Sequence, residues 1–229
     1  MNIIILVLSA DCGVYKELAQ ASQKTWASVY DKEEDVKVFY YYGYREGHPR
    51  PAEGMVIEDG HDLVCGNEEK IKTIGYKTIS SFRHLLDNYE FDYIFRCCAG
   101  SYIDQGNLKA FLEDKPREGL YCGAKGYVRG ITYASGSGYV LSRDLVKYVV
   151  DNESKWKHNL IDDVALGQMM EKVVTLDEGA KRIHMPNQHA ERMLNEMKNG
   201  ERDNEGHYHY HFVAPPAMMF KIHEFLNNG

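Results

Sequence analysis

The sequence predicts an α/β fold in which helices flank a mixed, mostly parallel sheet within a single domain. Apolar, β-branched runs alternate with stretches of helical period in the first half of the chain, as in parallel sheets with crossover helices. The first run, residues 3–8, is apolar throughout, as expected of a central strand with both faces buried. The chain has 229 residues, of which 44% are apolar and 27% charged, which suits one globular domain over residues 1–229.

The first half is expected to begin with that central strand and to alternate from there. A helix over residues 15–30 would place Leu18, Ala21 and Trp26 roughly on one side. Gly43 closes the second strand, and a loop rich in glycine, proline and charge follows it. In order, we expect a strand at 2–9, a helix at 15–30, a strand at 36–42, a loop at 44–54, short strands at 55–57 and 61–66, a helix at 70–86 and a strand at 91–96.

The second half is expected to contain shorter elements. Ser142 is a residue type that caps helices, so we expect a helix from there to about Val150. Residues 195–206 are polar and are not assigned to an element. The remaining expectations are a short helix at 107–113, strands at 119–123 and 133–141, a helix at 162–172, short strands at 173–175 and 182–184, an extended segment at 207–213 and an amphipathic helix at 217–226.

Charge and cysteine content exclude several function classes. A formal net charge of −7 disfavours non-specific nucleic-acid binding, which depends on a basic surface. The longest apolar run is far shorter than the roughly 20 residues that span a bilayer, so no membrane span is expected. Five cysteines, an odd number without CxxC spacing, argue against a disulfide framework and a structural zinc site. We therefore expect a cytoplasmic protein. The cysteines are Cys12, Cys65, Cys97, Cys98 and Cys122.

Two patches carry a resemblance to a known family. Residues 134–142 read Ala-Ser-Gly-Ser-Gly-Tyr-Val-Leu-Ser, and about 20 residues later 161–167 read Ile-Asp-Asp-Val-Ala-Leu-Gly. They resemble the SGxGY segment and the acid-Asp-Val helix start of the fringe and β-1,3-galactosyltransferase family. Weaker patches precede them in the family's order, at 23–26, 38–43, 61–63, 76–78 and 91–96. The resemblance covers roughly residues 2–170.

The resemblance implies a GT-A-type, Rossmann-like fold and transfer of a sugar from a nucleotide-sugar donor, a uridine-diphosphate sugar, to a hydroxyl of a glycan or glycoconjugate. Residues 1–130 would form the nucleotide-sugar-binding half and residues 131–229 the acceptor half. One alternative is a non-catalytic relative that only binds the sugar nucleotide or glycan. An unrelated nucleotide hydrolase is the other, although the sequence contains no GxxxxGK[ST] or GxSxG motif.

The sequence departs from the family where a divalent cation is normally bound. The family has an Asp-x-Asp cluster after the strand, whereas residues 96–102 read Arg-Cys-Cys-Ala-Gly-Ser-Tyr and the next carboxylate is Asp104. Manganese and magnesium prefer oxygen ligands, for which thiols are poor substitutes. The resemblance implies one of these metals, but the usual ligands are missing, so the sequence predicts no definite cofactor.

Inverting glycosyl transfer needs a carboxylate that deprotonates the acceptor hydroxyl. The resemblance assigns this role to Asp163, with Asp162 beside it. Both are expected at a helix N-terminus, which keeps a carboxylate ionised. The alternative is that the two aspartates only cap the helix.

The leaving diphosphate needs donors of positive charge or of hydrogen bonds. Residues after the first strand lie where open α/β sheets bind ligands, and the segment after residue 96 replaces the metal motif. His207, His209 and His211 alternate, so in a strand they would share one face, open to a metal, to phosphate or to simple packing. The candidate donor-binding residues are Ser9, Ala10, Asp11, Lys77, Arg96, Cys98, Ala99, Gly100, Ser101, His209 and His211.

The glycine-rich patch is the candidate wall for the acceptor or the donor sugar. Glycine lets the backbone approach a ligand closely, although a bulged strand or tight turn needs glycine too. The residues concerned are Ser135, Gly136, Ser137 and Gly138.

Overall fold

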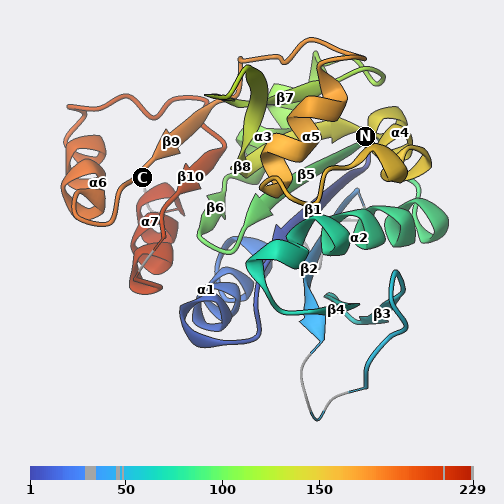
Figure 1. Cartoon of the computed structure of the whole chain (residues 1–229). Coiled ribbons are helices and arrows are strands. Elements are labelled where there is room, and N and C mark those ends of the chain that lie inside the picture. Colours follow the sequence, from blue (N-terminus) through green and yellow to red (C-terminus); the bar gives the residue numbers. More distant parts are fainter. Residues whose placement is uncertain (29–34, 45–46, 48, 214, 228–229) are drawn as a thin grey trace.

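The computed structural model describes residues 1–28, 35–44, 47, 49–213 and 215–227 (Figure 1). A seven-stranded sheet with the order β3-β4-β2-β1-β5-β8-β7 forms its centre. Strands β4, β2, β1 and β5 run parallel, while β3, β8 and β7 are added antiparallel at the two sides. The predicted α/β fold with a mixed, mainly parallel sheet is confirmed. The strands are β1 (Ile3–Leu8), β2 (Val36–Tyr44), β3 (Val56–Asp59), β4 (Asp62–Glu68), β5 (Tyr93–Cys98), β7 (Tyr121–Val128) and β8 (Ile131–Ser142).

Helices cover both faces of this sheet, and β1 shows why its sequence is apolar throughout. Ile3, Ile5 and Val7 pack into one hydrophobic core, whereas Ile4 and Leu6 pack into a second core on the opposite face. The first core lies under α1 (Gly13–Gln23), α3 (Gln105–Glu113), α6 (Ala190–Lys198) and α7 (Ala217–Asn227). The second lies under α2 (Ile74–Asn88), α4 (Arg143–Asp151) and α5 (Asp162–Met170).

A second, three-stranded sheet lies beyond the carboxyl end of β5 (Figure 1). Its strands are β6 (Ser101–Ile103), β9 (Arg182–His184) and β10 (His209–His211). Strand β10 pairs antiparallel with β6 and parallel with β9, so the C-terminal part of the chain returns to the segment that follows β5. This small sheet brings histidines and an arginine to the ligand-binding edge of the main sheet.

Three sequence-based expectations are corrected, and two elements were not anticipated. The helix expected at 15–30 ends at Gln23, because the Thr25 hydroxyl donates to the Ala21 carbonyl at 2.8 Å and competes with the helical ladder; residues 29 and 30 lie outside the described part. Residues 173–175 form no strand, since the N–H groups of Val173 and Val174 both bond the Met170 carbonyl in a turn. Helix α6 and strand β6 were not anticipated.

The extended segment expected at 207–213 contracts to the three residues of β10. His209 and His211 alternate within it, but His207 precedes the strand, so the three histidines do not form one strand face. Elsewhere the elements match with shifted ends. For example, α2 is preceded by a single 3-10 turn (Ile71–Thr73), and α3 begins after Asp104, whose carboxylate accepts the Asn107 N–H at 2.9 Å.

Two further features are the state of the cysteines and the character of the helices. All five cysteines are free thiols. In the described ranges, the protein has no helix of the length and apolar character needed to cross a lipid bilayer.

Candidate functional site

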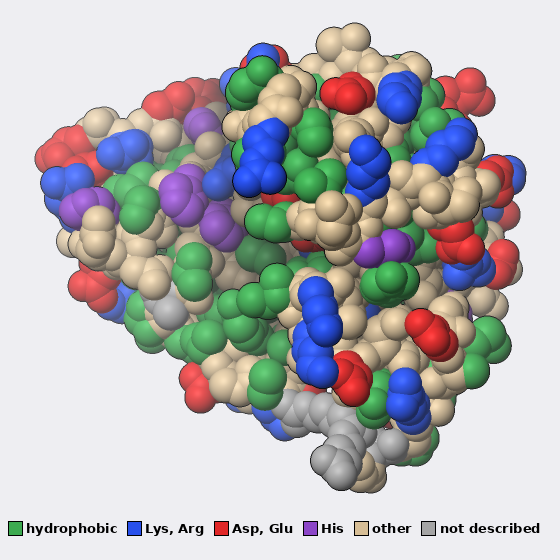
Figure 2. All heavy atoms as spheres, in the orientation of Figure 1, with side chains coloured by type: hydrophobic (Ala, Val, Ile, Leu, Met, Phe, Trp, Pro, Cys, Tyr) green, Lys and Arg blue, Asp and Glu red, His purple; other side chains and the backbone are tan. Residues whose placement is uncertain are grey.

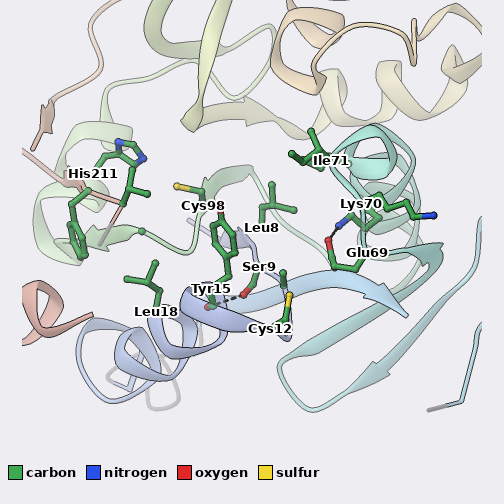
Figure 3. Close-up of a pocket in the computed structure, with 16 residues that line it drawn as sticks. Leu8, Ser9, Cys12, Tyr15, Leu18, Glu69, Lys70, Ile71, Cys98 and His211 are labelled. Atoms are coloured by element: carbon green, nitrogen blue, oxygen red, sulfur yellow. Dashed lines mark hydrogen bonds and ion pairs between the residues drawn. The ribbon is translucent and has the colours of Figure 1, made fainter. Parts of the chain in front are cut away.

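A cavity of about 420 Å³ opens at the carboxyl ends of β1 and β5 (Figure 3). Its volume falls within the range of small-molecule sites, and its place is that of ligand sites in open α/β sheets. Most of its wall is apolar, from Leu8, Cys12, Tyr15, Leu18, Ile71, Ile74, Phe212 and Val213. Its polar lining comes from Ser9, Glu69, Lys70, Lys77, Cys98 and His211.

The segment after β1 lies at the cavity, as the sequence indicated. Ser9 and Ala10 line it, and both also line a neighbouring cavity of about 280 Å³ that includes Asp11. The Ser9 N–H donates to the Tyr41 carbonyl at 3.0 Å, which fixes this turn to β2. Asp11 forms an ion pair with Lys16 at 2.8 Å. The two adjoining cavities give room for a ligand with two parts, such as a nucleotide joined to a sugar.

The segment after β5 forms the opposite wall. Cys98 and Gly100 line the cavity, whereas Ala99 and Ser101 are buried behind it. The Gly100 carbonyl accepts the Phe212 N–H at 2.8 Å, which fastens this segment to the end of β10. A Cβ atom on Gly100 would lie only 1.9 Å from the Phe212 carbonyl oxygen. Glycine is therefore required here by the close approach of two backbones.

Replacing Gly100 by alanine is expected to lower the free energy of unfolding by about 1–3 kcal/mol, because β10 or the β5 end must shift. Urea denaturation measures this change. Gly106→Ala is the matched control, since its Cβ would meet nothing nearer than 3.7 Å in helix α3 and alanine favours helix. Equal stability of Gly100→Ala and Gly106→Ala would contradict the packing argument.

The residues at the β5 end do not fit a magnesium or manganese site. The family's carboxylates are replaced by Cys97 and Cys98, and Cys97 is buried in the core. Across the described ranges, no group of three or more histidine, cysteine or acidic side chains is placed to hold a metal ion. Hard divalent cations need oxygen ligands, which this position does not offer.

Lys77 and Arg96, two residues expected to contact the donor, have their positive charges paired with carboxylates of the protein. Lys77 lines the cavity, but it is buried and its ammonium group pairs with Glu69. Arg96 is 1% exposed and does not line the cavity. The Arg96 guanidinium is therefore not exposed at the cavity where the donor is expected.

Arg96 instead joins three elements in the core beside the site. Its Nε donates to the Tyr41 hydroxyl at 2.9 Å, one terminal nitrogen donates to the Gly136 carbonyl, and the other donates to Asp162 at 2.7 Å. Although burial acts to lower the pKa of the guanidinium, Tyr41 and Asp162 raise it above its ordinary value. The guanidinium is therefore a fixed charge on β5 that joins β2, β8 and α5.

The two aspartates at the start of α5 have different roles. Asp162 is buried, and its carboxylate forms an ion pair with Arg96. Asp163 is half-buried and accepts the backbone N–H groups of Gly136 at 2.7 Å and Val164 at 2.8 Å. Burial raises the pKa of Asp163 above its ordinary value, against the lowering effect of the Gly136 N–H. Within the described ranges, Asp163 is thus the aspartate of the pair whose carboxylate forms no ion pair with a side-chain cation.

The glycine-rich patch lies on β8 between Asp163 and the small sheet. The hydroxyls of Ser135 and Ser137 are 2.9 Å apart, and the Ser137 carbonyl accepts the Ser101 hydroxyl at 3.4 Å. A Cβ on Gly138 would meet the His209 ring at 2.5 Å, so this glycine makes room for the imidazole. Neither these residues nor Asp163 line the 420 Å³ cavity itself; Ser137 is linked to it through Ser101, whose hydroxyl lies 3.8 Å from the Cys98 thiol on the cavity wall.

The histidines of β10 divide between core and cavity. His209 is 1% exposed and its Nε2 lies 2.9 Å from the Ser101 hydroxyl. His211 lines the cavity, and its Nδ1 lies 2.9 Å from the Nδ1 of His184 on β9. Burial, with the positive charge of Arg182, lowers the pKa of His211 to about 3. Sequence reasoning missed Arg182 and His184, although their alternation on an extended segment matches that of His209 and His211.

Comparison with known proteins agrees with this arrangement. Residues 124–178, which run from β7 to the residues after α5, match the family model described as Galactosyltransferase. They include both patches on which the resemblance to the fringe and β-1,3-galactosyltransferase family rests, and that resemblance is confirmed.

Solved structures share the fold at low sequence identity. A glycosyltransferase involved in glycosylation of the major capsid of PBCV-1 is 11% identical, with a TM-score of 0.52 over 98% of this chain and 100% of that one. The glycosyltransferase GlyE of Streptococcus pneumoniae TIGR4 is 10% identical, with a TM-score of 0.50 over 93% of this chain. The chain spans about half of GlyE, 54% of its length.

The fold is that of the GT-A glycosyltransferases. The chain is similar to the galactosyltransferase family in the segment that carries Asp163 and the glycine-rich patch.

Proposed function

We propose that this chain transfers a sugar from a nucleotide-sugar donor, a uridine-diphosphate sugar, to a hydroxyl of a glycan with inversion of configuration. The observation that carries the proposal is the placement of Asp163. Its carboxylate is held by the Gly136 N–H inside the galactosyltransferase segment, beside an edge of the sheet that has a cavity of nucleotide size.

The chemistry assigned to the chain's own residues is simple. Asp163 accepts the proton of the acceptor hydroxyl as its oxygen attacks the anomeric carbon. The bond from that carbon to the diphosphate oxygen breaks, and the nucleoside diphosphate leaves with the electron pair. The raised pKa of Asp163 makes it a stronger base than an exposed aspartate, and it remains ionised as long as the pH exceeds that pKa.

The donor is expected to occupy the 420 Å³ cavity at the ends of β1 and β5 and the adjoining cavity at the ends of β1 and β2. Ser9, Ala10 and Asp11 would contact its nucleoside, and the Cys98–Ser101 wall would lie along its diphosphate. The acceptor is expected to approach along Ser135–Gly138, on the same strand that positions Asp163. The apolar lining would exclude water and so limit hydrolysis of the donor.

A screen of nucleotide sugars with simple glycosides tests this function. Each donor is assayed with manganese, with magnesium and with chelator, and free nucleoside diphosphate and the new glycoside are both quantified. Because the β5 end does not fit a hard cation, transfer is expected to persist in chelator. Donor binding without transfer under all conditions would instead support the non-catalytic relative.

A further inference from the structure

Arg182 on β9 is a half-buried arginine without a counter-charge. In the parts of the chain that the structure describes, no carboxylate forms an ion pair with it, and its buried Nε has no hydrogen-bond partner. Burying a charge without a partner is costly, and folded proteins avoid it where function does not require it. Arg182 therefore differs from Arg96 and Lys77, whose charges are bound by Asp162 and Glu69.

The small sheet places Arg182 beside the cavity wall. In the register of β9 and β10, Arg182 lies next to His209 and His184 next to His211, and side chains two apart on a strand share a face. That face meets the end of β5, since His209 bonds Ser101 and His211 lines the cavity with Cys98. Figure 3 shows His211 and Cys98 on the same side of the cavity.

The positive charge of Arg182 contributes to lowering the pKa of the neighbouring histidines His184, His209 and His211. Burial is the largest cause of these lowered pKa values, and Arg182 is a further cause for His184. For His209 and His211, Arg182 acts together with the neighbouring histidines. These imidazoles are therefore neutral at physiological pH and keep nitrogen atoms for hydrogen bonding. Figure 2 shows histidine side chains gathered over β9 and β10, next to a hollow in the surface. On this face of β9 and β10, as far as the structure describes it, Arg182 is a cation without a paired carboxylate, and its neighbours are neutral imidazoles.

We propose that Arg182, assisted by His211, binds the diphosphate of the nucleotide donor and takes the place of the carboxylate-bound cation at the β5 end. This inference rests on the proposed function. A guanidinium presents parallel N–H groups that match two phosphate oxygens, and it keeps its protons throughout. As the bond between the anomeric carbon and the diphosphate breaks, the electron pair moves to the phosphate oxygen, whose growing charge faces Arg182.

Calorimetry in chelator tests the assignment with three probes: uridine diphosphate, uridine and inorganic pyrophosphate. Arg182→Gln is expected to weaken uridine diphosphate and pyrophosphate binding by about 10- to 100-fold, as for a lost charge-assisted hydrogen bond. Uridine, which lacks phosphate, is expected to bind both proteins equally. Lys181→Gln is the matched control, because it removes the same charge from the exposed residue that precedes β9, and it should leave all three affinities unchanged.

The variant is expected to fold, since it removes an unpaired cation. Its melting temperature without ligand should equal that of the wild type or exceed it by a few degrees. Should Arg182→Gln fail to fold, Arg182→Met, which retains an apolar stem of similar length, provides the same comparison.

The possible outcomes separate the inference from the proposed function. Equal binding of uridine diphosphate and pyrophosphate by wild type and Arg182→Gln would overturn the anion site and leave the transferase standing. Arg182-dependent binding of pyrophosphate without any binding of uridine diphosphate would support the anion site and contradict the uridine nucleotide. No binding of any probe by the wild type would overturn both.

Discussion

Replacing Asp163 by asparagine is expected to lower kcat for sugar transfer by about 10²- to 10⁴-fold, the contribution typical of a general base. Asparagine has nearly the same shape, and its carbonyl oxygen can still accept the Gly136 N–H that Asp163 accepts at 2.7 Å. It cannot take the proton of the acceptor hydroxyl. Donor affinity should change little, because Asp163 does not line the cavity assigned to the donor. Steady-state transfer and calorimetric donor binding, measured on the same preparation, separate the two effects.

Asp144→Asn is the matched control for this variant. Asp144 also lies in the first turn of a helix and accepts a backbone N–H from another segment, that of Gly119, at 3.0 Å. It belongs to α4, away from the cavity, so transfer should be unaffected. If Asp163→Asn and Asp144→Asn retain the same activity, Asp163 is only a structural acceptor and the general-base assignment is wrong.

The pKa of Asp163 gives a second expectation, for pH. Its folded-state pKa is raised above the ordinary 3.8, so folding favours the protonated form. The resulting cost to stability is absent below 3.8, develops between 3.8 and the folded-state pKa, and is fully present above it. At neutral pH, Asp163→Asn should therefore be at least as stable as the wild type in thermal denaturation. As pH falls through the raised pKa, kcat/KM of the wild type should fall, because the base becomes protonated; a profile that is still flat at pH 3.8 would contradict this.

The parts of the fold that local patterns encode were predictable. The run at 3–8 is apolar because β1 contributes to both cores, and that needs no knowledge of the rest of the chain. Helix α6 was not predicted, although Met193, Leu194 and Met197 are buried at helical spacing. The polar residues from 195 onward are typical of a loop and obscure this spacing. Strand β6 has three residues, and it exists through its pairing with β10, more than 100 residues away.

The candidate site was predicted in position more than in detail. The ends of β1 and β5 follow from the order of elements, so Ser9 and Cys98 were expected at one edge. Which cations remain available depends on long-range pairs that no local pattern encodes. Lys77 is bound by Glu69, eight residues earlier, and Arg96 by Asp162, 66 residues later. Among the described residues Arg182 has no paired carboxylate, and its place beside the cavity follows only from the assembled sheet β6-β10-β9.

Replacing Arg96 by methionine is expected to lower the free energy of unfolding by about 3–5 kcal/mol, because it leaves the buried Asp162 carboxylate without its cation. The Gly136 carbonyl would lose a donor in the same step, and the Tyr41 hydroxyl would keep only its bond with Thr78, at 2.9 Å. Urea denaturation should show a lower midpoint with an unchanged slope.

The matched control is Arg83→Met, which removes an arginine from an ion pair with Glu153 whose side chains are 34% and 52% exposed. Solvent screens such a pair, so the expected loss is below about 1 kcal/mol. Adding Asp162→Ala to Arg96→Met should recover part of the stability, because the unpaired carboxylate is then gone. A double variant that is less stable than Arg96→Met would show instead that Asp162 stabilises α5 independently of Arg96. Under the proposed function, Asp162 would act on transfer through the position of α5, and the adjacent Asp163 would be the carboxylate that meets the acceptor.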